Sequence, residues 1–288
     1  MLKRTITGAI YVAIIVGFFF LRDVDYRLFD ILTFIFCALG TFEVARAVKE
    51  YLYKGNFTLA AIFGIIFVPV FFVFENYTCF RGAYACLILS AAAVLYQAAY
   101  TAINTSGQNG RGLRAFGVNA LPFLYPSLLL LFILLSNEAA RGFICLLLIF
   151  VISPCADTFA YLVGMTYNKI RKGKAKKMCP RFSPKKTWAG AIGGVIGGIV
   201  GALVVYFAVD RADIVAAAKI SPVLIFIITG AVASVFTEIG DLFESYIKRK
   251  VGIKDMGKIM PGHGGIMDRI DGMSFAAVII YVLFALTL

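Results

Sequence analysis

Apolar blocks about twenty residues long recur along the whole chain, and this feature constrains the fold more than any other. A helix needs about 20 apolar residues to cross the roughly 30 Å of hydrocarbon in a bilayer. The sequence is 61% hydrophobic, whereas soluble domains contain about 45–50% apolar residues. We therefore predict an all-α, polytopic integral membrane protein in which residues 1–288 form a single membrane domain.

Nine of these blocks are long enough to be membrane-spanning helices. The first, residues 1–21, has the basic start and apolar run of a signal peptide. It contains no small-residue cleavage site before Arg22, so we predict that it is retained as the first span. The further predicted spans are residues 28–48, 58–74, 83–103, 116–135, 142–165, 187–208, 222–243 and 273–288.

Positive charge alternates between the segments that flank these spans. Of the 28 Lys and Arg residues, 22 lie in one alternate set of segments and 6 in the other. Because cytoplasmic loops are enriched in Lys and Arg, this pattern predicts a cytoplasmic N-terminus and an external C-terminus. The two most basic loops, residues 166–186 and 244–272, then lie on the same cytoplasmic face.

Two acidic residues inside predicted spans receive different interpretations. Asp157 interrupts an apolar run at a cost of roughly 2.5–3.5 kcal/mol, and it shares a helix stripe with Tyr161 and Gly164. It either lines a functional site or is buried against a neighbouring helix. Glu43 lies near the end of its span, where we expect a local ion pair with Arg46 or a side chain that reaches the interface.

The end of the first basic loop is predicted to start a helix. Residues 183–187 read SPKKT, which would place Lys185 and Lys186 beside the exposed N–H groups of a first helical turn. Such a terminus binds phosphate well. The six glycines between residues 190 and 201 repeat at four-residue spacing, which predicts close packing of this span against its neighbours.

Carboxylates gather near the end of the eighth predicted span. Glu238 and Asp241 are three residues apart and lie on one helix stripe. Like charges this close are destabilising unless a cation or a proton lies between them. Salt bridges to basic residues of the following loop would also explain the pair.

The most polar stretch of the chain is residues 245–271, which contain the only histidine, His263. Asp268 and Asp271 share a helical face if the last helix begins early, and with Asp241 they could offer oxygen ligands that suit Mg²⁺. The glycine-rich turn between these aspartates could bring N–H groups to phosphate oxygens. Together these groups indicate phosphoryl or nucleotidyl transfer, although the sequence has neither a GxxxxGKS/T nor a GxGxxG motif.

Four blocks of the C-terminal half resemble the phosphatidate cytidylyltransferases, also called CDP-diacylglycerol synthases. The longest, residues 245–271, contains Ser-x-Ile-Lys-Arg, Lys-Asp-x-Gly and Pro-x-His-Gly-Gly-x-x-Asp-Arg-x-Asp in that order. The other blocks are Asp-x-x-Ala-Tyr-x-x-Gly from residue 157, Ser-Pro-Lys-Lys-Thr-Trp from residue 183 and Gly-Asp-Leu-x-Glu-Ser from residue 240. Residues 1–140 resemble the family only as membrane spans.

The resemblance implies an enzyme that transfers CMP from CTP to phosphatidate, giving CDP-diacylglycerol and pyrophosphate for phospholipid biosynthesis. It implies Mg²⁺ or Mn²⁺ as cofactor and CTP, phosphatidate and the lipid bilayer as partners, with no nucleic acid and with a homodimer left open. Residues 1–140 would be a helical scaffold and residues 141–288 the catalytic half. The protein would lie in the cell (inner) membrane with its active site facing the cytoplasm.

The resemblance also gives expected roles to the residues that match the family's motifs. The expected metal ligands are Asp241 and Asp268. The expected catalytic residues are Asp241, Asp268, Asp271 and Lys254. The expected substrate-binding residues are Ser183, Lys185, Lys186, Lys248, Arg249, His263, Gly264, Gly265, Arg269 and Asp157.

Two alternative functions stay open. A CTP-dependent lipid or polyprenol kinase would need the same charge-neutralising site but would direct attack to the γ-phosphorus. An ion or proton transporter could use Asp157 and Asp241 as a relay inside the membrane. Against the transporter, the charged residues cluster at one predicted membrane face, and no inverted repeat is visible in the sequence.

Overall fold

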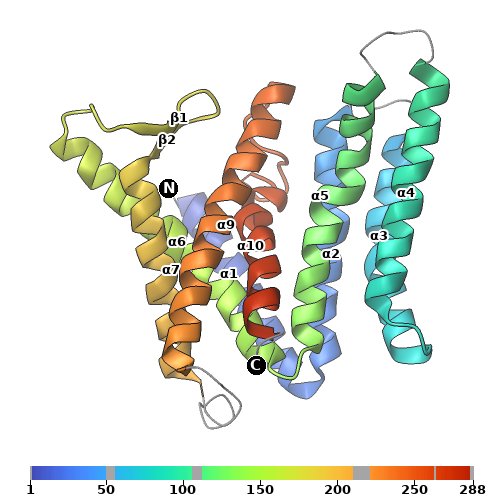
Figure 1. The fold of residues 1–288 in the computed structure, drawn as a ribbon, viewed down its shortest axis with the longest axis horizontal. Helices are drawn as coiled ribbons and strands as arrows, with labels where there is room; N and C mark the ends of the chain where they lie inside the picture. The colour runs from blue at the N-terminus through green and yellow to red at the C-terminus, as the bar shows by residue number, and fades with distance from the viewer. Residues whose placement is uncertain (1, 50–55, 106–111, 210–220, 263, 286–288) are drawn as a thin grey trace. The chain divides into compact units, whose positions relative to one another are not determined.

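Helices make up nearly all of the described chain (Figure 1). The structure is a computed structural model that describes residues 2–49, 56–105, 112–209, 221–262 and 264–285. Its residue contacts divide the chain into two compact units, and each is described by itself. Unit 1 comprises residues 1–134 and 251–269, and unit 2 comprises residues 135–250 and 270–288.

Unit 1 contains the N-terminal helices. They are α1 (Leu2–Val24), η1 (Tyr26–Leu28), α2 (Phe29–Ala47), α3 (Asn56–Tyr77), α4 (Gly82–Thr105) and most of α5 (Gly112–Glu138). α2 packs against α3, and α3 packs against α4. The rings of Phe63 in α3 and Phe123 in α5 meet with centroids 5.2 Å apart. Thr41 of α2 and Ser127 of α5 share a buried hydrogen bond of 3.3 Å, so a polar contact also joins these helices.

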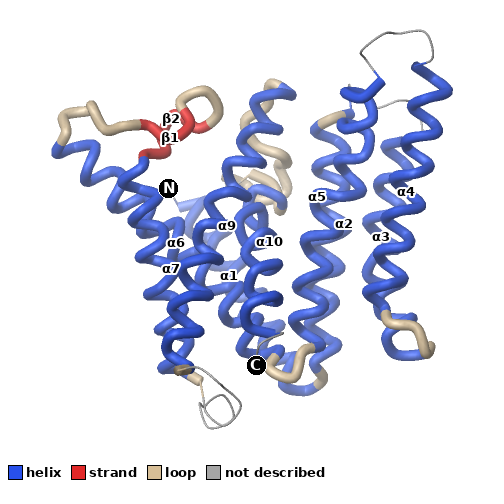
Figure 2. The backbone as a smooth tube through the Cα atoms, viewed as in Figure 1, coloured by secondary structure: helices blue, strands red, loops and turns tan. Residues whose placement is uncertain are grey.

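Unit 2 combines long helices with a short hairpin. Its elements are α6 (Gly142–Ile170), β1 (Lys177–Cys179), β2 (Ser183–Thr187), α7 (Trp188–Ala208), α9 (Pro222–Val251), most of α10 (Met267–Ile280) and the π-helix η3 (Tyr281–Ala285). α6 and α7 lie side by side (Figure 1). β1 and β2 are antiparallel, with Lys177 opposite Thr187 and Cys179 opposite Ser183 (Figure 2).

The predicted all-α membrane architecture is confirmed. Among the described residues, eight helices are long and apolar enough to cross a membrane, and they correspond to the first eight predicted spans. The ninth predicted span, residues 273–288, covers most of α10 together with η3, and its last three residues lie outside the described residues. α10 begins at Met267, early enough to carry both Asp268 and Asp271 in its first two turns.

The prediction that residues 183–187 start a helix is wrong. These residues form strand β2, because they pair with β1 and their backbone is therefore extended. α7 begins one residue later, at Trp188, and the hydroxyl of Thr187 accepts the N–H of Gly190 at 3.0 Å. Lys185 and Lys186 thus precede the helix and lie on the strand that leads into it.

The glycine rows of α7 pack against two neighbouring helices, as the sequence predicts. A Cβ atom on Gly197 would lie 2.6 Å from the backbone oxygen of Cys155 in α6. On the adjacent face, a Cβ atom on Gly198 would lie 2.5 Å from the backbone oxygen of Gly230 in α9. Real Cβ atoms do not approach backbone this closely, so glycine lets α7 contact both α6 and α9. This packing holds β2 close to the ends of α6 and α9.

Candidate active site

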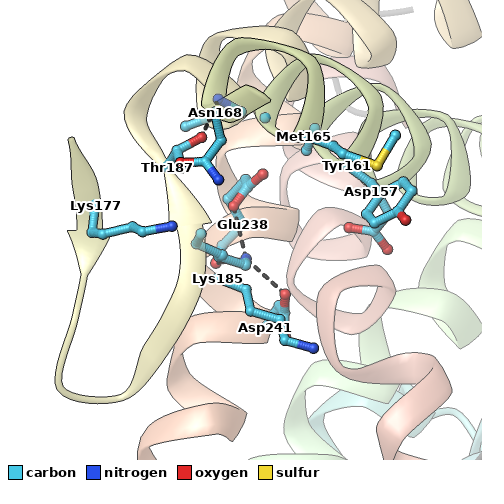
Figure 3. Close-up of a pocket in the computed structure, with 14 residues that line it drawn as sticks. Asp157, Tyr161, Met165, Asn168, Lys177, Lys185, Thr187, Glu238 and Asp241 are labelled. Carbon is cyan, nitrogen blue, oxygen red and sulfur yellow. Dashed lines mark hydrogen bonds and ion pairs between the residues drawn. The ribbon is translucent and has the colours of Figure 1, made fainter. Parts of the chain in front are cut away.

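A cavity of about 390 Å³ opens in unit 2 beside the β1–β2 hairpin (Figure 3). The residues that line it are Asp157, Ala160, Tyr161, Gly164, Met165, Asn168, Lys177, Lys185, Lys186, Thr187, Gly190, Ala191, Glu238 and Asp241. It brings together four of the residues predicted from the sequence, namely Asp157 of α6, Lys185 and Lys186 of β2, and Asp241 of α9. Ser183, at the start of β2, is half-buried and lies outside this lining.

One ammonium group holds two carboxylates of α9 together in this cavity. Lys186 Nζ lies 2.7 Å from Glu238 Oε2 and 2.7 Å from Asp241 Oδ2 (dashed in Figure 3). Burial alone would lower the pKa of Lys186, but the charges of Asp241 and Glu238 outweigh burial and raise that pKa above its usual value. The cation that separates the acidic pair of α9 therefore comes from β2, and not from the loop after α9.

Two further lysines give the cavity positive charge. Lys177 reaches from β1 toward the cavity, and Asp157 lies across from it (Figure 3). Lys185 is exposed and Lys177 is half-buried. Within the described part of the chain, neither lysine forms an ion pair. Both ammonium groups are therefore available to an anionic ligand, whereas Lys186 already neutralises two carboxylates.

The predicted stripe of α6 faces this cavity. Asp157, Tyr161 and Gly164 all line it, as their helical spacing predicts. The Asp157 side chain is exposed rather than packed into a helix interface. Asp157 therefore lines the cavity, and its role in a functional site stays a prediction.

Three polar residues of the cavity were missed by the sequence reasoning. Lys177 lies in the basic loop 166–186, where membrane topology alone favours positive charge, and Asn168 and Thr187 carry no signal by themselves. Asn168 Oδ1 is buried and has no hydrogen-bond partner among the described residues, so it can accept a hydrogen bond from a ligand. The pairing of β1 with β2 would have identified Lys177, because its partner Thr187 directly follows the two predicted lysines.

Two predicted substrate contacts at the end of α9 have partners within unit 2. Lys248 forms an ion pair with Glu244, one turn earlier in the helix. Arg249 Nε donates to the backbone oxygen of Phe182 at 3.4 Å, and the rings of Phe182 and Tyr246 meet edge to face with centroids 5.0 Å apart. These contacts tie the turn of the hairpin to α9. The roles of Lys248 and Arg249 in substrate binding stay predictions.

Asp271 lies beside α9, at the point where Gly240 approaches it. A Cβ atom on Gly240 would lie 2.7 Å from the backbone oxygen of Asp271, so a larger residue would push the helices apart. Burial and the nearby charge of Asp241 raise the pKa of the Asp271 carboxyl to about 6. Two carboxylates this close repel each other, an arrangement that favours a bound cation.

Unit 1 contains the loop that precedes α10, which we call the signature loop and describe at residues 252–262 and 264–266. Asp268 Oδ2 accepts the backbone N–H groups of Gly265 at 2.7 Å and Met256 at 3.0 Å. The Asp268 carboxylate therefore organises the signature loop in addition to any role toward a ligand.

The other predicted residues of this region differ in exposure. Lys254 and Arg269 are exposed, and Gly265 is buried. Gly264 has a φ of +88°, a backbone conformation that glycine adopts without strain. His263 lies outside the described residues, so its expected role stays a prediction.

The prediction that Glu43 pairs with Arg46 or reaches the membrane interface is wrong. The Glu43 side chain is buried, with 2% of its surface exposed, and Oε2 accepts the backbone N–H of Met267 at 2.9 Å. The expected ion pair with Arg46 is not among the ion pairs of the described residues. The N–H groups at the start of α10 attract this carboxylate instead, because a helix N-terminus carries unsatisfied donors and partial positive charge.

The described residues contain no group of three His, Cys, Asp or Glu side chains placed to hold a metal ion. Mg²⁺ does not require such a group, because one or two carboxylates commonly bind it together with substrate phosphates and water. Asp241 and Asp271 carry carboxylate oxygens of this kind in unit 2, and Lys186 is paired with Asp241 Oδ2 at 2.7 Å. A magnesium ion at these carboxylates stays a prediction. The expected ligand pair, Asp241 and Asp268, belongs to two different units and stays a prediction.

Comparison with known proteins gives matches along the whole chain. The model of a family described as "Cytidylyltransferase family" matches residues 2–287. A phosphatidate cytidylyltransferase of Rickettsia conorii is 33% identical over 233 residues, which cover 80% of this chain and 92% of the relative. One of Helicobacter pylori is 32% identical over 285 residues, which cover 98% of this chain and 91% of the relative.

A third relative aligns over a shorter part. The phosphatidate cytidylyltransferase of Brucella suis biovar 1 is 38% identical over 180 residues, or 62% of this chain. The chain spans 59% of the length of that relative.

Proposed function

Because the chain belongs to the cytidylyltransferase family, we propose that it transfers CMP from CTP to phosphatidate. The products are CDP-diacylglycerol, a precursor for phospholipid synthesis, and pyrophosphate. Relatives called phosphatidate cytidylyltransferase support the proposal, and two of them align over more than nine-tenths of their own length.

The observation that carries the proposal is the cavity of unit 2, where cations and carboxylates face one another. Lys177 and Lys185 supply positive charge for the phosphates of CTP. A phosphate oxygen of phosphatidate attacks the α-phosphorus, the bond from that phosphorus to the β-phosphate oxygen breaks, and pyrophosphate leaves with the bonding electrons. Because the nucleophile belongs to the substrate, the chain needs only to position the reactants and to neutralise charge.

Mg²⁺, or Mn²⁺ in its place, is the proposed cofactor. When bound, such an ion neutralises charge on the reacting phosphates. Asp241 and Asp268 are the proposed ligands, each on the basis of the motif that it matches. In unit 2, the negative charge of Asp241 acts on the nearby Asp271 carboxyl, and two acidic groups this close support the first of these assignments.

We place the reaction at the cytoplasmic face of the cell (inner) membrane. The basic loops 166–186 and 244–272 are expected on that face because cytoplasmic loops are rich in Lys and Arg. CTP is soluble and phosphatidate is a lipid, so a site at this surface can receive both.

Isotope labelling tests the reaction directly. Purified protein in mixed micelles with phosphatidate and Mg²⁺ is given CTP labelled at either the α- or the γ-phosphorus. Label from the α position is expected in the lipid product, and label from the γ position is expected in pyrophosphate. Transfer of γ label to the lipid would instead identify a lipid kinase, and the absence of any CTP-dependent product would favour the transporter.

A further inference from the structure

Glu43 connects the N-terminal helices of unit 1 to the signature loop. It lies in α2, outside the sequence blocks that resemble the cytidylyltransferases, and its side chain is 2% exposed. Its Oε2 accepts the N–H of Met267, which follows 224 residues later in the sequence. Burying a carboxylate is costly unless hydrogen bonds and charge compensate it, so the start of α10 is an integral partner of Glu43.

Two glycines of the signature loop region leave space for this carboxylate. A Cβ atom on Gly257 or on Gly265 would overlap the carboxylate group of Glu43, and the three nearest atoms at both positions all belong to Glu43. Neither glycine has a positive φ. A side chain at either position would therefore displace the Glu43 carboxylate, whereas the backbone conformation itself would accept one.

A second carboxylate holds the same loop from within. Asp268 accepts the N–H groups of Met256 and Gly265, so Gly265 contacts both Glu43 and Asp268. The signature loop is thus folded around two acidic side chains, one from α2 and one from α10. Glu43 is the one that fixes the loop to a helix distant in sequence.

We propose that Glu43 is a positioning residue for cytidylyl transfer, which acts by fixing the signature loop and the start of α10 against α2. It holds the backbone that carries Lys254, Asp268 and Arg269, and it does not contact the substrates. This role rests on the proposed function, because these three residues are the ones expected to act on CTP and phosphatidate.

Replacement of Glu43 tests this role through kinetics. Glu43→Ala is expected to raise KM for CTP and to lower kcat, each by about 10-fold or more. The reason is that small displacements of reacting groups slow the reaction strongly. Glu43→Gln keeps an acceptor oxygen for Met267 and is expected to retain most of the activity. The control is Asp30→Asn, a change in a buried carboxylate at the other end of α2, about 20 Å from Glu43 along the helix. If Asp30→Asn altered KM and kcat as much as Glu43→Ala does, the positioning role of Glu43 would be contradicted.

A double-mutant cycle tests the contact itself. The methyl group of Gly257→Ala would overlap the Glu43 carboxylate, so this variant alone is expected to lose activity. Glu43→Ala removes the overlapping atoms, so adding Gly257→Ala in that background should cause little further loss. Additive losses would mean that the two residues are independent, and they would overturn the proposal.

Hydrogen exchange without nucleotide separates this inference from the proposed function. In Glu43→Ala, the amides of Met256, Gly265 and Met267 are expected to exchange about 10-fold faster, while those of α7 keep their protection. Unchanged exchange at these amides would overturn the role of Glu43 even if the wild-type protein makes CDP-diacylglycerol. Faster exchange in a protein whose wild type makes no CDP-diacylglycerol would refute the proposed function and leave the Glu43 anchor established.

Discussion

At the scale of single residues, the three lysines of the cavity have different surroundings. Lys186 forms ion pairs with Glu238 and Asp241, both at 2.7 Å. Lys177 and Lys185 make no ion pair within the described residues, and both line the cavity. We therefore expect Lys177 and Lys185 to supply the positive charge that binds the phosphates of CTP.

Lys177→Ala is expected to lower kcat/KM for CTP. A hydrogen bond to a charged group contributes about 1.5–3 kcal/mol, which corresponds to roughly 10- to 100-fold in rate. Lys172→Ala is the matched control, because Lys172 belongs to the same basic loop but does not line the cavity. Steady-state kinetics with varied CTP compares the two variants. Equal losses would assign both lysines to a general effect of loop charge.

Asp268→Asn separates the two roles of Asp268. An asparagine oxygen can accept the same N–H groups of Met256 and Gly265, so the signature loop should keep its fold and thermal stability. The loss of negative charge should nevertheless abolish Mg²⁺-dependent transfer. Activity titrated with Mg²⁺, together with thermal unfolding, checks both expectations. Full activity in this variant would remove Asp268 from the proposed metal ligands.

At the scale of elements, β2 is positioned by the packing of the helix that follows it. Thr187 ends the strand and caps α7, whose glycines contact α6 and α9. The turn of the hairpin is tied to α9 by Arg249 and by the ring of Phe182. The placement of Lys185 and Lys186 therefore depends on contacts made along the whole of α7.

Gly198→Ala is expected to destabilise unit 2. The added methyl group would meet the backbone oxygen of Gly230 and the side chain of Ser234, and overpacking of this kind costs about 1–3 kcal/mol. Gly17→Ala in α1 is the control, because no atom lies within 4 Å of a Cβ atom there. Thermal unfolding in detergent measures both. A drop in midpoint for Gly17→Ala alone would contradict the packing described for α7.

The sequence predicted the helices well and the contacts between distant segments poorly. The apolar blocks identified eight spans because length and hydropathy are local properties of a segment. Strand β2 was missed because its extended form depends on pairing with Lys177–Cys179, which no local pattern reveals. Glu43 was assigned to nearby Arg46 because its real partner, Met267, is 224 residues away. Motif resemblance predicted four residues of the cavity but could not supply Asn168 or Lys177.

At the scale of the whole molecule, the account requires both basic loops to face the cytoplasm. A fluorescent protein that matures only in the cytoplasm should therefore be bright when fused before Met1 and dark when fused after Leu288. Immunoblots of the membrane fraction verify that both fusions are made. A bright C-terminal fusion would mean an even number of spans and would remove the charge argument for the site's orientation.

If the cavity of unit 2 is where CMP is transferred from CTP to phosphatidate, the product balance of the purified protein depends on Asp241. Wild type and Asp241→Asn are each given CTP, phosphatidate and Mg²⁺. The wild type is expected to form CDP-diacylglycerol and pyrophosphate in equal amounts, and Asp241→Asn is expected to remain folded but to form neither. Formation of CDP in place of pyrophosphate, or full activity in Asp241→Asn, would contradict this role of the cavity.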